Sequence, residues 1–140
     1  MALRAEVKID VILHSTEDID KILKSFLDNF NLEQEKFKIQ NLTGHFDNPI
    51  TLLSINLQKE NAQSFISKFC HVLSKTDFAQ IYDNIEENTS SSGLRIKISK
   101  QRMVEGKIML ENKDAIKINI SSPVYVKKDS KKIYQQLLKQ

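Results

Sequence analysis

Basic side chains recur at every second position in part of the C-terminal third of the chain. Residues 94–98 read Leu-Arg-Ile-Lys-Ile, which is the pattern of a β-strand with one apolar and one basic face. Several long cations on one sheet face are suited to binding nucleic-acid phosphates, because each contact releases counterions. The candidate RNA-binding residues on this face and in the turn that follows are Arg95, Lys97, Lys100, Arg102, Lys107 and Lys117. An ordinary solvated sheet face is the alternative, since exposed lysines also discourage edge pairing.

A second group of candidates lies in residues 42–50, which read Leu-Thr-Gly-His-Phe-Asp-Asn-Pro-Ile. Gly44 and Pro49 predict a tight connection between two strands. His45 is a candidate general base, ligand or phosphate contact, and Phe46 is the loop aromatic best placed to stack on a base. No serine or cysteine nucleophile motif accompanies His45, so a turn histidine bonded to backbone is the plainer interpretation. We retain both residues as candidate RNA contacts.

Metal and cofactor sites have little support in the sequence. His14, His45 and His71 lack metal-binding spacing, and Cys70 is the only cysteine. Cys70 falls near the apolar face of a predicted helix, where a small core residue is expected rather than a reactive thiol. The three glycines stand apart and form no phosphate-binding loop. We therefore expect no metal, no cofactor and no enzymatic activity.

Length and composition predict a single globular domain over residues 1–140. The chain is 40% hydrophobic and 28% charged, which is typical of a folded domain. Its longest apolar runs fall short of the roughly 20 residues that span a bilayer, so we expect no membrane partner. The single cysteine favours a reducing, cytoplasmic location.

Charge is distributed unevenly along the chain. Residues 1–92 carry 9 Lys and Arg against 14 Asp and Glu, which gives −5. Residues 93–140 carry 12 Lys and Arg against 4 Asp and Glu, which gives a net charge of +8. A basic half of this kind is expected to meet a polyanion such as RNA, or to attract an acidic partner surface.

Apolar periodicity divides the chain into ten elements. Strands are predicted over residues 3–13, 36–42, 50–57, 94–98, 108–110 and 116–120, and helices over 17–30, 62–73, 77–85 and 129–138. Ser15 or Thr16 is expected to cap the first helix and Asp77 the third. A phase change near Gln40 predicts a bulge, and the polar segment 86–92 is expected to be a mobile loop.

The order of these elements, β-α-β-β-α-α-β-β-β-α, predicts the fold class. Short turns between consecutive strands imply a mostly antiparallel sheet, and amphipathic helices imply one covering layer. We expect an α+β two-layer sandwich with helices on one face of the sheet. The other face, which carries the basic residues, is expected to stay largely uncovered.

Two sequence blocks carry a family resemblance. Residues 44–50 resemble the Gly-His-x-Gly-Asn-Pro-Ile signature of an archaeal RNA-binding family described as a predicted exosome subunit. Residues 94–96, Lys100-Gln101 and Gly106 resemble its second block, a strand that ends in Lys-Gln and is followed by glycine. Asp47 stands where the family usually has glycine. If that position requires positive φ, aspartate adopts it less readily.

The resemblance covers essentially the whole chain and implies a fold like that of ribosomal protein L5. It also implies RNA binding without known enzymatic activity, and a partnership with the exosome or another RNA-processing complex. The residues themselves favour recognition of structured RNA through its backbone and shape. They leave open a protein-interaction or assembly module that does not bind RNA, including a homodimer.

Overall fold

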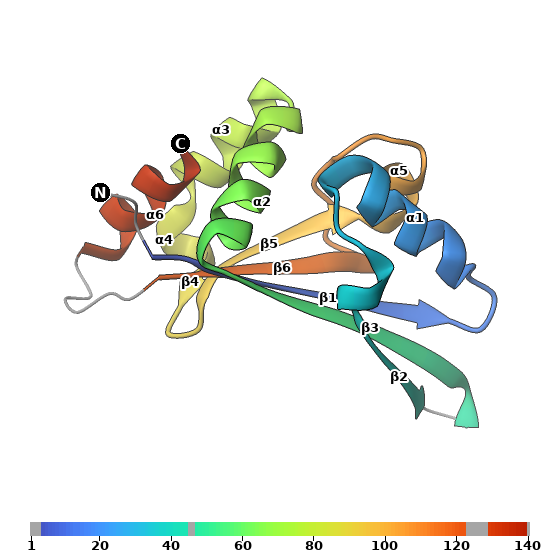
Figure 1. Ribbon diagram of the computed structural model, residues 1–140. Helices are drawn as coiled ribbons and strands as arrows, with labels where there is room; N and C mark the ends of the chain where they lie inside the picture. Colours follow the sequence, from blue (N-terminus) through green and yellow to red (C-terminus); the bar gives the residue numbers. More distant parts are fainter. Residues whose placement is uncertain (1–3, 45–46, 123–128, 140) are drawn as a thin grey trace. The chain divides into compact units, whose positions relative to one another are not determined.

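The computed structural model describes residues 4–44, 47–122 and 129–139, and it has the predicted α+β fold (Figure 1). The strands of this part of the chain form one six-stranded sheet in the order β2-β3-β1-β6-β5-β4. They are β1 (Glu6–His14), β2 (Lys38–Thr43), β3 (Pro49–Gln58), β4 (Thr89–Ser90), β5 (Gly93–Ser99) and β6 (Ala115–Ser121). The α-helices are α1 (Ile19–Phe30), α2 (Lys59–Val72), α3 (Lys75–Asp83), α4 (Ile85–Asn88), α5 (Lys100–Val104) and α6 (Ser130–Leu138). No helix of the described residues is both long and apolar enough to cross a membrane.

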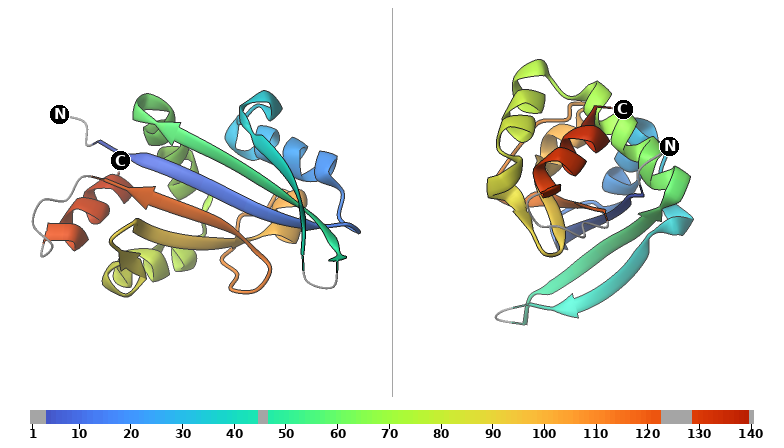
Figure 2. Two further views of the ribbon diagram at one scale, coloured as in Figure 1. Left: turned by 90° about the horizontal axis from the view of Figure 1, so that it is seen from below. Right: turned by 90° about the vertical axis from the view of Figure 1, so that its left-hand side faces the viewer.

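The chain packs as two compact units. Unit 1 comprises residues 1–8, 56–96 and 118–140, and unit 2 comprises residues 9–55 and 97–117. Within each unit the helices cover one face of the strands and leave the other face open (Figure 2). This arrangement is the helix-on-one-face layering that the sequence predicts.

Unit 1 is built around helix α2. The buried residues of α2, Ala62, Phe65, Ile66 and Phe69, follow helical spacing and form its apolar stripe. The rings of Phe65 and Phe69 stack with centroids 5.7 Å apart. Helix α6 packs against both α2 and α4. Burial of each of the Phe and Ile side chains stabilises the fold by about 1.5–3 kcal/mol.

Unit 2 is held together by α1, α5 and a short 3₁₀ turn, η1 (Gln34–Lys36). Asp18, rather than the expected Ser15 or Thr16, caps α1, because its carboxylate accepts the N–H of Asp20 at 2.9 Å. Asn31 ends α1 in the left-handed conformation, with φ of 57°. The amide group of Asn29 donates to the Met103 carbonyl at 3.2 Å and thereby ties α1 to α5.

Two further expectations, for strand β2 and for the start of helix α3, are wrong. The β2–β3 ladder runs without interruption from Lys38↔Ser54 to Thr43↔Pro49, so there is no bulge near Gln40. Ser74, not Asp77, caps α3, because the Ser74 hydroxyl accepts the N–H of Asp77 at 3.1 Å. The helix therefore begins at Lys75, three residues before the start that a cap at Asp77 predicts.

Residues 86–92 are not the loop that their polar composition predicts. They contribute to α4 and β4, and Ser90 pairs with Gly93 in an antiparallel hairpin. Gly93 has φ of +129°, and a Cβ atom there would lie 2.5 Å from the Ile120 carbonyl oxygen. This close approach to β6 requires glycine at the start of β5.

The predicted strand at residues 108–110 is reduced to a single bridge, between Leu110 and Ile98. The segment before it forms helix α5 instead of a turn. Ser99 caps this helix, since its hydroxyl accepts the N–H of Arg102 at 3.1 Å. β5 ends at this cap, so the side chains of Lys100–Val104 follow helical spacing and no longer alternate as in a strand.

Candidate nucleic-acid interface

Strands β5 and β6 alternate between buried apolar and outward polar residues, as predicted. Ile96 and Ile98 are buried on β5, whereas Arg95 is exposed and Lys97 is partly exposed. On β6, Lys117 is exposed between two buried isoleucines. The two strands are neighbours in the sheet. Lys97 and Lys117, which both belong to unit 2, therefore lie on the open face of its strands, and Arg95 has the same outward alternation within unit 1.

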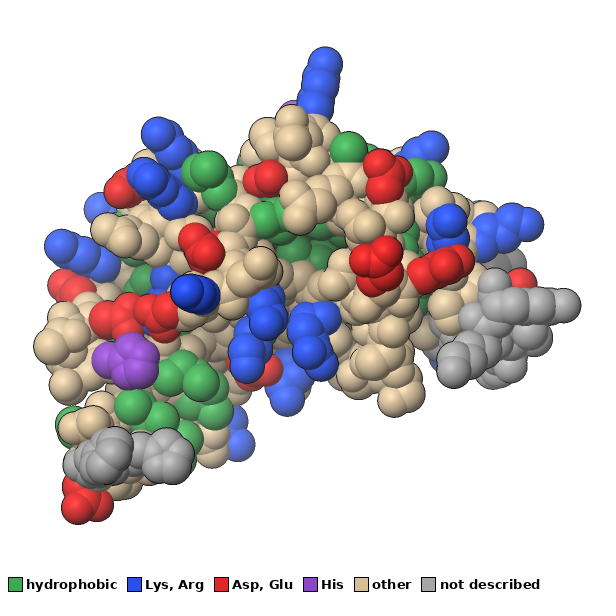
Figure 3. All heavy atoms as spheres, turned by 180° about the vertical axis from the view of Figure 1, so that it is seen from behind, with side chains coloured by type: hydrophobic (Ala, Val, Ile, Leu, Met, Phe, Trp, Pro, Cys, Tyr) green, Lys and Arg blue, Asp and Glu red, His purple; other side chains and the backbone are tan. Residues whose placement is uncertain are grey.

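The cations do not form an unbroken basic surface. Figure 3 shows Lys and Arg side chains interspersed with Asp and Glu side chains. On β1, Glu6 and Asp10 have the same outward alternation as Lys8 between them. Salt at physiological strength screens surface charges beyond about 8 Å. Contacts with phosphate thus depend on individual side chains rather than on the net charge of the chain.

Asn119 on β6 shares the outward alternation, but its amide group is engaged. It donates to the Ser92 carbonyl oxygen at 2.7 Å. This hydrogen bond fixes the β4–β5 turn against β6. We therefore assign Asn119 a structural part in holding the strand face.

Arg102 and Lys107 are exposed but lie outside the strands. Arg102, in α5, makes an ion pair with Glu105 at 3.0 Å. Lys107 follows Gly106, and its backbone N–H donates to the Arg102 carbonyl at 2.9 Å. The strand spacing assumed for Lys107 is wrong, because the residues that precede it form a helix.

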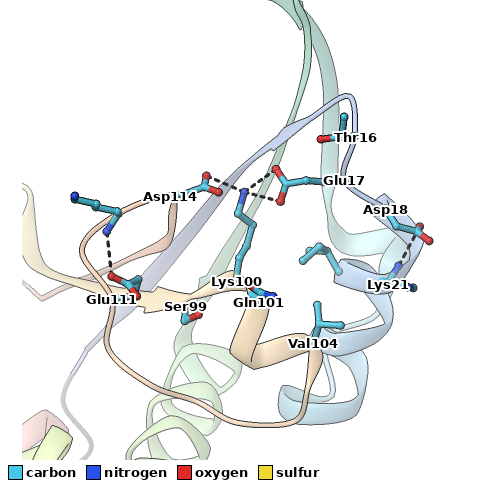
Figure 4. A pocket seen from close by; sticks show the side chains of 12 residues that line it. Thr16, Glu17, Asp18, Lys21, Ser99, Lys100, Gln101, Val104, Glu111 and Asp114 are labelled. Carbon is cyan, nitrogen blue, oxygen red and sulfur yellow. Dashed lines mark hydrogen bonds and ion pairs between the residues drawn. The ribbon is translucent and has the colours of Figure 1, made fainter.

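Lys100 is buried, with only 4% of its surface exposed. Its ammonium group donates to the Ile12 carbonyl at 2.8 Å, and lies 2.9 Å from Glu17 Oε2 and 3.0 Å from Asp114 Oδ1 (Figure 4). These protein oxygens occupy its hydrogen-bonding capacity. Lys100 therefore does not offer its charge to solvent, although the sequence places it among the phosphate-binding candidates.

A hollow of about 440 Å³ surrounds this ion cluster in unit 2. Four carboxylates and three lysines line it, together with uncharged side chains (Figure 4). The charged lining residues are Glu17, Asp18, Lys21, Lys100, Glu111, Lys113 and Asp114. Opposite charges are thus present in near balance, which does not favour an anion such as RNA phosphate.

The same cluster brings together residues that sequence reasoning missed. Potential ligand atoms of His14, Glu17 and Asp114 all lie within 4.8 Å of one another. The Lys100 ammonium group already bonds both carboxylates, so it supplies the positive charge at this position. His14 Nε2 lies 3.8 Å from Asp114 Oδ1. Only the spacing of His14 and Glu17 is visible in the sequence, because Asp114 comes from a distant segment.

The turn between β2 and β3 places Asp47 in the left-handed region, with φ of 59°. The position where the resembled family has glycine does therefore adopt positive φ in this chain. The Gly44 N–H donates to the Asn48 carbonyl at 2.7 Å and closes the turn. His45 and Phe46, the two candidate contacts, lie outside the described residues.

Comparisons with known proteins define the class to which this arrangement belongs. A family model described as RNA binding matches residues 6–122, which include both candidate strands. The chain belongs to this RNA-binding family.

Relatives of the chain come from archaea. An uncharacterized protein of Methanocaldococcus jannaschii, MJ0213, is 19% identical over 139 residues, which cover 94% of this chain and 93% of the relative. The crystal structure of AF2318 from Archaeoglobus fulgidus is similar, with a TM-score of 0.80 and 23% identity over 96% of this chain and 99% of that one. The structure of Mth689 from Methanothermobacter thermautotrophicus has a TM-score of 0.77 and 22% sequence identity, over 98% of this chain and 99% of that one. Both solved structures are described as DUF54 proteins, and at these identities they establish the fold alone.

Proposed function

We propose that the protein binds structured RNA through the outward side chains of β5 and β6. The observation that carries the proposal is the outward alternation of Arg95, Lys97 and Lys117 on β5 and β6, where Arg95 and Lys117 are exposed and Lys97 is partly exposed. Membership of a family described as RNA binding supports the same function. Long, flexible cationic side chains on strands contact phosphates without reading bases, which fits recognition by shape and backbone.

Arg102 and Lys107 are accessory contacts in this proposal. Each is exposed, but Arg102 would have to exchange its ion pair with Glu105 for one with phosphate. Lys100 has no direct part, since its ammonium group is bonded to protein oxygens. His45 and Phe46 remain proposed contacts from their position in the β2–β3 turn.

The proposal is tested by removing the three strand cations together. Arg95, Lys97 and Lys117 are replaced by alanine, and binding to a structured RNA is measured over a range of salt concentrations. We expect weaker binding and a salt slope reduced by up to about three units, because each lost phosphate contact removes about one.

A matched control removes the same charge elsewhere. Lys24 on α1, Lys36 on η1 and Lys68 on α2 are exposed and lie outside the strands. Their triple alanine variant is expected to keep nearly the parental affinity and slope. Equal losses in the two triple variants would show that net charge, rather than the strand face, controls binding.

We further propose that the protein acts by binding and not by catalysis. Burial raises the pKa of the Cys70 thiol to about 12, so the thiol stays protonated at neutral pH and is a poor nucleophile. The His14 side chain faces Asp114 and belongs to the ion cluster around Lys100. Loss of RNA processing on His45→Ala, with RNA affinity unchanged, would instead indicate an enzymatic role.

Association with the exosome or another RNA-processing complex is a further part of the proposal. Its support is the resemblance of residues 44–50 and 94–106 to the family described as a predicted exosome subunit. The likeness to ribosomal protein L5 and the cytoplasmic location also stay predictions. Nuclease-resistant copurification with a protein partner, without measurable RNA affinity, would favour the alternative of a protein-interaction module.

A further inference from the structure

Strand β2 forms one edge of the sheet and is paired on one side only. In the sheet formed by the described residues it lies next to β3 and has no second neighbour. Five of its six residues are exposed, and the sixth, Gln40, is partly exposed. The right-hand view of Figure 2 shows β2 as the outer strand of the β2–β3 hairpin. The unpaired backbone groups of such an edge are a template for another strand.

The hydrogen bond that closes the β2–β3 turn shows which backbone groups of β2 are free. The Gly44 N–H donates to Asn48, so this pair is a hydrogen-bonded pair of the antiparallel ladder. Hydrogen-bonded and non-hydrogen-bonded residue pairs alternate along an antiparallel ladder. Thr43↔Pro49 is therefore a non-hydrogen-bonded pair, and Leu42↔Ile50 is a hydrogen-bonded pair. Pro49 has no N–H, and its non-bonded position is consistent with this assignment.

The alternation fixes the direction of the remaining groups. The N–H and C=O groups of Ile39, Asn41 and Thr43 point away from β3, toward the open edge. They are evenly spaced along the strand, at every second residue. The edge can therefore accept one more antiparallel strand over these five residues.

Nothing in residues 39–43 blocks such pairing. Natural edges are protected by lysine, proline, bulges or short length. This segment reads Ile-Gln-Asn-Leu-Thr, without charge or proline, and its register with β3 is unbroken. Ile39 and Leu42 are large apolar residues exposed by 44% and 45%. The only charge on β2 is that of Lys38, at its first position.

We propose that β2 pairs with β2 of a second copy of the chain, antiparallel and about a two-fold axis at Asn41. A two-fold axis perpendicular to the sheet keeps the same face of both copies on the same side. The residues whose backbone N–H and C=O groups point to the open edge must then lie opposite one another. Centring on Asn41 sets Asn41 opposite Asn41 of the partner copy, and Ile39 opposite its Thr43. Each of these pairs exchanges two backbone hydrogen bonds.

A second copy fits this edge because the segment is complementary to itself. It is uncharged from Ile39 to Thr43, so the two strands meet without like charges opposite each other. Lys38 falls outside the paired residues. Leu42 of each copy comes to lie opposite Gln40 of the other, which removes part of its exposed apolar surface from water.

The register makes a sharp test possible, since Asn41 would face itself. Asn41→Lys and Asn41→Asp are each expected to weaken self-association of the full chain by about tenfold or more, because each places two like charges in contact. A one-to-one mixture of the two variants should restore dimers by pairing opposite charges. Sedimentation velocity over a concentration series measures both effects.

The control for added charge is Asn56→Lys. Asn56 is exposed on β3, in the half of that strand that does not pair with β2. This variant should associate as the parent does. A parent chain that stays monomeric at every concentration contradicts the proposal, as does a mixture that fails to recover dimers. Either result would leave the edge to a strand from a different protein.

A covalent probe tests the same register independently. With Cys70 replaced by alanine, Asn41→Cys should form an interchain disulfide under mild oxidation, because Cα atoms in a bonded pair lie about 5.5 Å apart. Thr51→Cys, on the neighbouring strand β3, should form it much more slowly. Equal rates would show random collision and contradict pairing at Asn41.

Discussion

Strand β5 and helix α5 use their lysines in opposite ways. Lys97 is partly exposed on the open sheet face, whereas Lys100 is 4% exposed and bonded to Glu17 and Asp114. The change occurs within three residues because Ser99 ends the strand and caps the helix. A run of basic residues therefore supplies both a candidate RNA contact and a structural ion cluster. Exposure and bonding, not lysine content, distinguish the two.

Within this comparison, the larger effect on stability is expected from the buried lysine. Lys100→Met keeps the aliphatic stem but removes the charge that bonds Glu17, Asp114 and the Ile12 carbonyl. We expect a loss of about 2–3 kcal/mol in the free energy of unfolding, measured by urea denaturation. This is below the range for a fully buried pair, because the Asp114 side chain is 62% exposed.

Lys97→Met is the matched control for that measurement. It should change the free energy of unfolding by no more than about 0.5 kcal/mol, as expected for a surface substitution. RNA affinity should respond in the reverse order, falling for Lys97→Met and not for folded Lys100→Met. Equal effects of the two substitutions on stability would remove the distinction between strand and helix.

The glycines that flank this region provide a second comparison. At Gly93 a Cβ atom would lie 2.5 Å from a backbone oxygen of Ile120, whereas at Gly106 nothing lies within 4 Å. Both have positive φ, +129° and +86°. Gly93→Ala should therefore cost about 3 kcal/mol or more in unfolding free energy, and Gly106→Ala only about 1 kcal/mol. Thermal or urea denaturation of both variants measures the difference, and equal losses would contradict the close approach of β5 to β6.

Strong alternation allowed some elements to be predicted from the sequence. The isoleucines of β6 and the Leu-Arg-Ile-Lys-Ile run of β5 indicate both the strands and their outward faces. The segment 86–92 was misjudged because its structure depends on contacts that composition does not reveal. Thr89, for example, donates to the Ile85 carbonyl at 2.6 Å and so joins α4 to β4.

The candidate site was only partly predictable for a related reason. Whether a lysine is exposed depends on partners from distant segments, and Glu17 is 83 residues away from Lys100. Ser99 was the sequence signal for helix α5. Serine is a common N-cap residue, and the apolar Met103 follows at helical spacing. It indicated a helix in place of the predicted turn, and with it the displacement of Lys100 and Lys107 from the strand face.

The central claim is that the outward face of β5 and β6 contacts RNA. Its most direct test is ultraviolet crosslinking of the full chain to bound RNA, followed by mapping of the crosslinked peptides. We expect peptides from residues 93–99 and 115–121 to dominate, with fewer crosslinks at the accessory contact Arg102 and helix α1 largely unmodified. Crosslinks concentrated on the helices, with none on β5 or β6, would contradict the account.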